Sequence, residues 1–353
     1  MLCKIKEGNL FFLCHYVFYS FYVIILLRMV IKMSVTLKYL VNENQEISIE
    51  TEIKVIKDVG IGKNQTRMVK YAEEEIGFLK NSSKTTSATL DNLEYFISNL
   101  GKHILGVNVA DIHKAYDNGE FLGTISKNVA RENETLIMLS EIIETLMEEE
   151  KPEVIEIASQ INEIKNRNVQ QFHKKHGMIE ERAILEEEED IKQIIEMFPK
   201  ALDLISVPSE QKENIKKEYF KMIMFDILTN QVDRNNNNYG IVYDKKNETT
   251  RFSELFDNST IHIPGLPDTH YCLNGFLINR KSLIGCLLDN YGAYVNEIVI
   301  PIVENRDVLL EKTRQLSKKT LTESEQEMFM PLFERNLNDV CEMTKEKTTS
   351  TKK

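Results

Sequence analysis

One aspartate and one asparagine stand five positions apart in the stretch QVDRNNNNYGIVYD, residues 231–244. Phosphoryl transfer to a hydroxyl group needs a carboxylate that accepts the hydroxyl proton and an amide oxygen that ligates Mg²⁺. Asp233 and Asn238 supply these two groups at the D-x-x-x-x-N spacing typical of this chemistry. The motif also arises by chance in a chain rich in Asp and Asn, so its neighbours have to support it.

A second metal-binding carboxylate is expected one hairpin after the motif. The segments YGIVYD (239–244) and RFSELFD (251–257) predict that hairpin, and Asp257 stands at its end. Asp257 would ligate the Mg²⁺ that bridges the nucleotide phosphates. The alternative is a simple Asx turn through Asp257, Asn258 and Ser259.

Residues suited to phosphate binding lie upstream in the expected order. Gly60 and Gly62 fall between two predicted strands, where glycines let main-chain N–H groups approach phosphates. Lys80 on a strand and Glu94 on the next helix can form the ion pair that fixes a lysine at the α- and β-phosphates. Lys70 competes for this role but comes one strand early, so Lys80 is preferred.

Each of these features also has an ordinary structural explanation. The glycines could form a hairpin turn, Lys80 could be an exposed strand residue, and Glu94 could face solvent on its helix. The combined order of glycine loop, lysine, glutamate, D-x-x-x-x-N and aspartate is much harder to obtain by chance. The order therefore favours a phosphotransferase.

The elements that must position these residues fall into a β-rich part and a mainly helical part, which predicts an α+β fold. In the β-rich part, alternating patterns predict strands, and a face of apolar residues spaced three and four apart predicts one helix that Gly101 ends. The strands are expected at 35–41, 47–56, 66–71, 77–81, 107–116 and 119–127, and the helix within the segment 90–105.

Long helical patterns begin after Asn128. Helices are expected at 132–150, 152–166, 186–205 and 209–231, followed by three or four more from Ser282 to about Thr344. The predicted organisation is an N-terminal extension at 1–32, a small β-rich lobe at 33–127, a larger α-rich lobe at 128–345 and a disordered polar tail at 346–353.

Composition narrows the class of protein. The net charge of -11 disfavours nucleic acid as the main ligand. The five cysteines are an odd number without a CxxC pair, which favours reduced thiols and a cytoplasmic location.

The N-terminal region allows two interpretations. Residues 11–27 contain no Asp, Glu, Lys or Arg, and their length is at the short limit for a membrane span. We favour a start of translation at Met29 or Met33, which would leave the upstream segment out of the protein. A membrane anchor through residues 11–27 is the second interpretation.

The two strongest segments together resemble a known family. FDILTNQVDRNNNNYGIVYD followed by FSELFDNS resembles the catalytic and metal-binding segments of the HipA-like kinases, whose pattern is approximately F-D-x-L-x-x-N-x-D-R-H-x-x-N-[WFY]-G and then L-x-P-x-[FY]-D-N-[SG]. VGIGKNQTRMVKY, GFLKN and LEYFISNLG resemble that family's glycine loop, ATP-lysine strand and following helix. The resemblance covers roughly residues 53–275.

The resemblance implies a two-lobed protein-kinase-like fold that uses ATP with Mg²⁺ and phosphorylates serine or threonine on a protein substrate. It implies that Asp233 is the catalytic base, that Asn238 and Asp257 are metal ligands, and that Lys80 binds phosphates while paired with Glu94. It also implies that the main chain near Ile125, Ser126 and Lys127 hydrogen-bonds the adenine.

Two departures limit what the resemblance implies. The family often has His where Asn235 stands, and Asn cannot be protonated. The chain has no room before Val35 for the extra N-terminal subdomain of full-length HipA toxins, so it resembles a compact branch of CtkA-type kinases, and toxin–antitoxin biology is not carried over. The alternatives are a nucleotide-binding pseudokinase or interaction module, and a small-molecule or lipid phosphotransferase on the same fold.

Overall fold

The computed structural model describes residues 54–58, 65–71, 75–81, 88–117, 120–173, 179–258, 261 and 269–350. All of them belong to one compact unit, Ile47–Lys353. The predicted N-terminal extension, the strand predicted at 35–41, and Gly60 and Gly62 lie outside the described residues.

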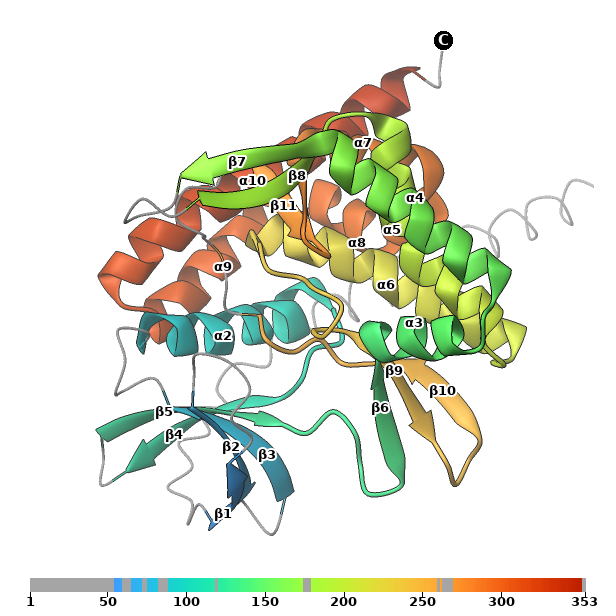
Figure 1. The fold of residues 1–353 in the computed structure, drawn as a ribbon. Helices are drawn as coiled ribbons and strands as arrows, with labels where there is room; N and C mark the ends of the chain where they lie inside the picture. The colour runs from blue at the N-terminus through green and yellow to red at the C-terminus, as the bar shows by residue number, and fades with distance from the viewer. Residues whose placement is uncertain are drawn as a thin grey trace, which may run out of the picture. The chain divides into compact units, whose positions relative to one another are not determined.

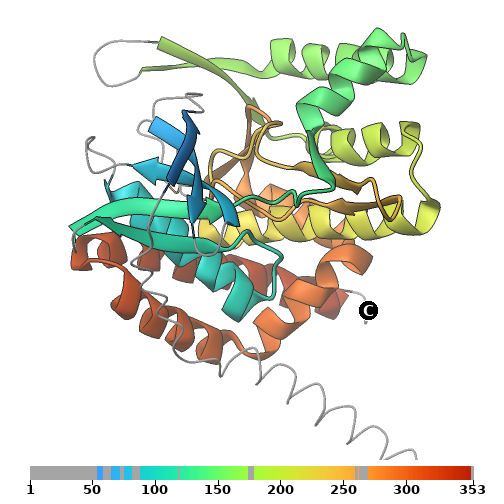
Figure 2. The same ribbon diagram turned by 90° about the horizontal axis from the view of Figure 1, so that it is seen from below.

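A five-stranded antiparallel sheet forms the smaller part of this unit, with the strand order β1-β2-β3-β5-β4. Helix α2 (Ala88–Leu100) joins β3 to β4 and packs against β4 and β5 (Figures 1 and 2). The strands are β1 (Lys54–Asp58), β2 (Gln65–Tyr71), β3 (Glu75–Asn81), β4 (Ile112–Asp117) and β5 (Glu120–Lys127).

The larger part is mainly helical. Its helices are α3 (Leu139–Glu148), α4 (Pro152–Asn168), α5 (Glu188–Leu204), α6 (Ser209–Thr229), α7 (Arg280–Asn290), α8 (Gly292–Glu304), α9 (Arg306–Thr320) and α10 (Glu323–Ser350). Helix α6 contacts α5, α7, α8, α10 and β10, and every residue from 222 to 229 is buried. A helix that is enclosed on all sides is a rigid support for the loop that follows it.

Two small sheets complete the larger part. Strands β6 (Glu134–Met138), β9 (Gly240–Asp244) and β10 (Thr249–Phe252) form an antiparallel sheet in the order β10-β9-β6. Strands β7 (Val169–His173), β8 (Ile179–Leu185), β11 (His270–Leu273) and β12 (Phe276–Asn279) form a second sheet in the order β11-β12-β8-β7. The β9–β10 hairpin leads from Asn238 to Asp257, as the sequence predicts.

The structure differs from the sequence predictions at several segments. The segment 132–150 is not one helix, because Glu134–Met138 forms β6 and pairs with β9 before α3 begins. The hairpins β7–β8 and β11–β12 were not predicted, and their parallel contact through β8 and β12 joins segments far apart in the chain. Helix α10 continues to Ser350, into the segment predicted as a disordered tail.

Gly101 changes the type of helix rather than ending it. The α-helix stops at Leu100, but residues Gly101–Leu105 continue as a π-helix, η1, which Gly106 ends in the left-handed conformation at φ 65°. A side chain at Gly101 would place its Cβ 2.9 Å from the ring of Phe225 on α6. The glycine therefore allows close packing between the end of α2 and α6.

No helix in the described ranges is long and apolar enough to cross a membrane.

Gly240 should be essential for the stability of the β6–β9 pairing. An added Cβ would lie 2.1 Å from the carbonyl oxygen of Ile137 on β6, which forces the two strands apart. We expect Gly240→Ala to lower the free energy of unfolding by about 1–3 kcal/mol or more, measured by chemical denaturation. The control is Gly292→Ala, where the nearest atom to the Cβ is 3.8 Å away. Equal midpoints for the two variants would contradict this prediction.

Candidate active site

The D-x-x-x-x-N motif lies on a short loop between α6 and β9, residues 230–239, named here the DxxxxN loop. Asn230 caps α6 in the left-handed conformation at φ 57°, and its N–H group hydrogen-bonds the helix carbonyls of Asp226 and Ile227. The chain therefore turns sharply out of the buried end of α6. This turn starts the DxxxxN loop from a fixed position.

Arg234 is the centre of the polar network and is fully buried. Its guanidinium forms two bonds to the carboxylate of Asp226 on α6, Nε to Oδ2 at 2.9 Å and Nη2 to Oδ1 at 2.7 Å. It also donates to the main-chain oxygens of Phe256 at 3.0 Å and Asn238 at 3.3 Å, and to Oδ1 of Asn258 at 2.8 Å. One side chain therefore connects α6, the DxxxxN loop and residues 253–258, named here the Asp257 loop.

Asn238 has an orientation that suits a metal ligand. Its side-chain Nδ2 donates to the main-chain oxygen of Asp233 at 3.0 Å, across the DxxxxN loop. Since the amide nitrogen is used inside the loop, the amide oxygen remains as the acceptor atom. The side chain of Asp233 is half-buried at the same end of α6.

The asparagines that precede Asn238 in the run 235–238 also make hydrogen bonds. Asn235 accepts the N–H group of Asn237 at 3.0 Å with its side chain, which forms a local turn. The side chain of Asn237 accepts the hydroxyl hydrogen of Ser140 on α3 at 2.6 Å, and the main-chain oxygen of Asn236 accepts the N–H of the same serine at 3.2 Å. This link to α3 was not predicted from the sequence.

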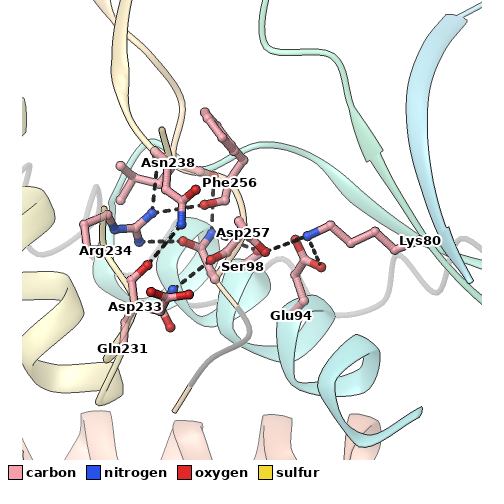
Figure 3. Close-up of polar contacts among 11 residues, drawn as sticks. Lys80, Glu94, Ser98, Gln231, Asp233, Arg234, Asn238, Phe256 and Asp257 are labelled. Atoms are coloured by element: carbon pink, nitrogen blue, oxygen red, sulfur yellow. Dashed lines mark hydrogen bonds and ion pairs between the residues drawn. The ribbon is translucent and has the colours of Figure 1, made fainter. Parts of the chain in front are cut away.

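Lys80 joins the two parts of the protein through two carboxylates. Its Nζ donates to Oε1 and Oε2 of Glu94 at 2.8 and 2.9 Å, and to Oδ1 of Asp257 at 2.8 Å. The predicted ion pair between Lys80 on β3 and Glu94 on α2 is thus present, and Glu94 is 1% exposed. In Figure 3, Asp257 lies between this pair and the group formed by Arg234, Asp233 and Asn238.

Neighbouring charges determine the protonation states of Lys80 and Asp257. Burial by itself would lower the pKa of Lys80, but the carboxylates of Glu94 and Asp257 outweigh it and raise the pKa above its ordinary value. Burial would likewise raise the pKa of Asp257, but Lys80 and Arg234 lower it. Lys80 is therefore cationic and Asp257 anionic at neutral pH.

The Asp257 loop is held from both sides. On one side, Gln231 of the DxxxxN loop donates its side-chain Nε2 to the main-chain oxygen of Asp257 at 2.7 Å. On the other side, Nδ2 of Asn258 donates to the hydroxyl of Ser98 at 3.3 Å. Ser98 stands one helical turn after Glu94 on α2, so the same face of α2 contacts the Asp257 loop directly through Ser98 and is linked to it through Lys80.

The predicted adenine-binding residues lie inside a sheet. Ile125 and Ser126 pair with β3 on one side of β5 and with β4 on the other. Lys127 pairs with β3 and donates its N–H to the main-chain oxygen of Asp111 at 2.8 Å. The main chain of Ile125 and Ser126 is therefore flanked by strands on both sides.

The segment that connects the two parts, residues 128–133, is anchored by an arginine. Arg251 on β10 donates to the main-chain oxygen of Val129 at 2.9 Å and to Glu134 at 3.1 Å. It also donates to Glu254 at 3.0 Å. The connecting segment is thus tied to the β9–β10 hairpin.

The donor atoms suit Mg²⁺ better than a softer metal. Within the described residues, no group of three or more His, Cys, Asp and Glu side chains could hold a metal ion. The carboxylate of Asp257 and the amide oxygen of Asn238 are hard oxygen donors. Mg²⁺ characteristically takes one or two protein oxygens and completes its shell with water and substrate phosphates. A site of this composition fits Mg²⁺ bound together with a nucleotide.

The residues that hold the site together, above all the partners of Arg234, were not predicted from the sequence. A usable signal existed in the apolar stretch KMIMFDILT, which contains a single charged residue after its lysine, Asp226. A carboxylate on a helix that is buried all round needs a charged partner, and Arg234 is the nearest arginine that follows it. No such feature of the sequence marked Ser98 as a residue of the site.

No protein-family model matches the sequence, and no curated protein matches it. Solved structures with a similar fold do exist. The crystal structure of the Helicobacter pylori proinflammatory kinase CtkA superposes with a TM-score of 0.55 at 13% sequence identity, over 84% of this chain and 97% of CtkA. This chain has the fold of CtkA. The prediction of an α+β, two-lobed protein-kinase-like fold is therefore confirmed.

A second similar structure is HipA of Shewanella oneidensis MR-1, from the complex of a toxin–antitoxin system with HipB and operator DNA. It matches with a TM-score of 0.40 at 12% identity, over 85% of this chain and 67% of HipA.

Arg234 should be the most important ionic side chain for stability. Replacing it with methionine leaves the buried carboxylate of Asp226 without its cation, so we expect Arg234→Met to lower the free energy of unfolding by about 3–5 kcal/mol. The control is Arg314→Met, whose exposed pair with Glu334 should contribute less than about 1 kcal/mol. Urea denaturation of both variants measures the difference, and similar losses would contradict the central role of Arg234.

Proposed function

We propose that the protein is an ATP- and Mg²⁺-dependent protein kinase that phosphorylates serine or threonine. The fold is similar to that of a protein described as a kinase, and this supports phosphoryl transfer as the reaction by analogy. The observation that carries the proposal is the position of Lys80 between Glu94 and Asp257, beside the DxxxxN loop. A lysine held by a helix glutamate and close to a metal-binding aspartate is the arrangement that kinases use to bind nucleotide phosphates.

The roles follow from the chemistry of each group. Asp233 accepts the proton of the acceptor hydroxyl as general base. Asn238 and Asp257 would hold Mg²⁺, and Asp257 needs no deprotonation because its pKa is already lowered. Lys80 places a permanent positive charge at the phosphates, and Glu94 fixes its direction. When bound, Mg²⁺ with ATP supplies the phosphoryl group and neutralises its charge.

The adenine site that we propose lies directly after the residues that the sequence suggested. Its hydrogen bonds were expected from Ile125, Ser126 and Lys127, but strand pairing surrounds the main chain of the first two. We place the adenine instead beside the connecting segment, residues 128–133, directly after β5. Arg251 holds this segment against the β9–β10 hairpin, which gives the base a fixed edge to bind.

Several classes of hydroxyl group suit the proposed base. Asp233 would serve equally as base for a hydroxyl on a protein, a small molecule or a lipid. The net charge of -11 disfavours a surface of anionic lipids. A serine or threonine side chain of a protein is therefore the proposed acceptor, and nucleic acid is not a proposed substrate.

Transfer of labelled γ-phosphate tests the proposal. Purified protein incubated with labelled ATP and Mg²⁺ should label itself or a generic protein substrate on serine or threonine, as phosphoamino-acid analysis would show. EDTA should abolish the labelling. We expect Asp233→Ala and Asp257→Ala each to reduce it at least about a hundredfold, because the first removes the proposed general base and the second a proposed metal ligand.

The matched control is Asp307→Ala. This variant removes an exposed aspartate on α9, outside the proposed site, and should leave labelling unchanged. Thermal unfolding of each variant verifies that the fold is retained. Persistent labelling in Asp233→Ala or Asp257→Ala would show that the site is assigned wrongly. ATP binding without any labelling would favour a nucleotide-binding pseudokinase, and labelling of small molecules alone would favour a different acceptor.

A further inference from the structure

Gln231 is a buried polar residue with half of its amide unused. Its side chain is fully buried, and its Nε2 donates to the main-chain oxygen of Asp257 at 2.7 Å. Its Oε1 is buried and has no hydrogen-bond partner in the described part of the chain. A buried amide oxygen without a partner costs free energy, which an apolar side chain of the same size would avoid. The hydrogen bond made by the amide nitrogen therefore accounts for a glutamine at this position.

The residue that accepts this hydrogen bond, Asp257, has an unusual main-chain conformation. Asp257 has φ 57°, in the left-handed region that non-glycine residues seldom adopt, although aspartate tolerates it better than most. Such conformations persist only where the surrounding structure enforces them, and they concentrate at functional sites. The carboxylate of Asp257 contacts Lys80 at 2.8 Å from this conformation.

The DxxxxN loop holds two successive carbonyl groups on either side of the Asp257 α-carbon. Arg234 Nη1 donates to the oxygen of Phe256 at 3.0 Å, and Gln231 Nε2 donates to the oxygen of Asp257 itself at 2.7 Å. Figure 3 shows both donors on the same side of the Asp257 loop. Fixing both peptide groups fixes the direction in which the carboxylate leaves the chain.

The two donors differ in what else they do. Arg234 also binds Asp226 and Asn258, so it is needed for the fold as a whole. Gln231 is neutral, and among the described residues its side chain makes one hydrogen bond, the one to Asp257. Its loss should therefore change the direction of Asp257 while the two lobes remain folded.

We propose that Gln231 is a positioning residue that holds Asp257 in its left-handed conformation and so sets the affinity of the site for the divalent cation. The inference rests on the proposed function, because it assigns Asp257 to metal binding. Gln231 acts through the main chain of Asp257 and touches neither the metal nor the substrate.

Metal binding measured apart from turnover tests this role. Mn²⁺ titrated into the full chain with a non-hydrolysable ATP analogue can be followed by electron paramagnetic resonance. We expect Gln231→Met, which keeps the size but not the donor, to raise the half-saturating Mn²⁺ concentration about tenfold or more, as is usual for groups that orient a metal ligand. Gln231→His, which keeps an N–H donor, should recover most of the affinity.

The matched control is Gln211→Leu. Gln211 on α6 also bonds a main-chain group, accepting the N–H of Thr250 at 2.7 Å, but it lies outside the site. We expect this variant to bind Mn²⁺ like the wild type. Labelling activity gives a second measurement, because raising Mg²⁺ should restore the rate of Gln231→Met and should not restore that of Asp233→Ala.

The outcomes separate the two proposals. If the wild type neither binds Mn²⁺ with the analogue nor transfers phosphate, the proposed function fails. If the wild type does both and Gln231→Met has unchanged Mn²⁺ affinity, the role of Gln231 is wrong. Should Gln231→Met not fold, Gln231→Leu replaces it; failure of both to fold would make Gln231 a purely structural residue and overturn the inference.

Discussion

The buried ion pair between Arg234 and Asp226 is the interaction on which the rest of the site depends. Both groups are fully buried, so removing either would leave an uncompensated charge in the protein interior. The pair is stable because its geometry is bidentate and because the other guanidinium hydrogens have acceptors in the DxxxxN loop and the Asp257 loop. The same bonds that satisfy the arginine therefore fix the relative positions of the two loops.

A second network connects this centre to the five-stranded sheet. Lys80 on β3 is shared between Glu94 and Asp257, and Ser98 contacts Asn258 one turn further along α2. The direction of α2 and the direction of the Asp257 carboxylate are thus linked through several short contacts. A site divided between two lobes needs such a link, because the groups proposed to bind phosphate and metal come from opposite sides.

The sequence predicted the elements whose signal is local. Helices α4, α5 and α6 appeared close to their expected positions because each has its own apolar face or a continuous apolar run. Strand β6 was mistaken for helix, and the hairpins β7–β8 and β11–β12 were missed, because short apolar segments become strands only when distant partners pair with them. The ion pair of Lys80 with Glu94 was predictable because residue types and element order were sufficient to suggest it.

The sequence by itself determined which chemical groups are present and in what order: a lysine, a glutamate, the D-x-x-x-x-N motif and a later aspartate. Only the tertiary structure decided how these groups are held, through Arg234 beneath both loops, Ser98 behind Asn258, and Gln231 at the carbonyl of Asp257. The physical reason is that these bonds join positions far apart in the chain or use main-chain atoms. Residue types do not reveal which main-chain atoms will be buried or which side chains will reach them.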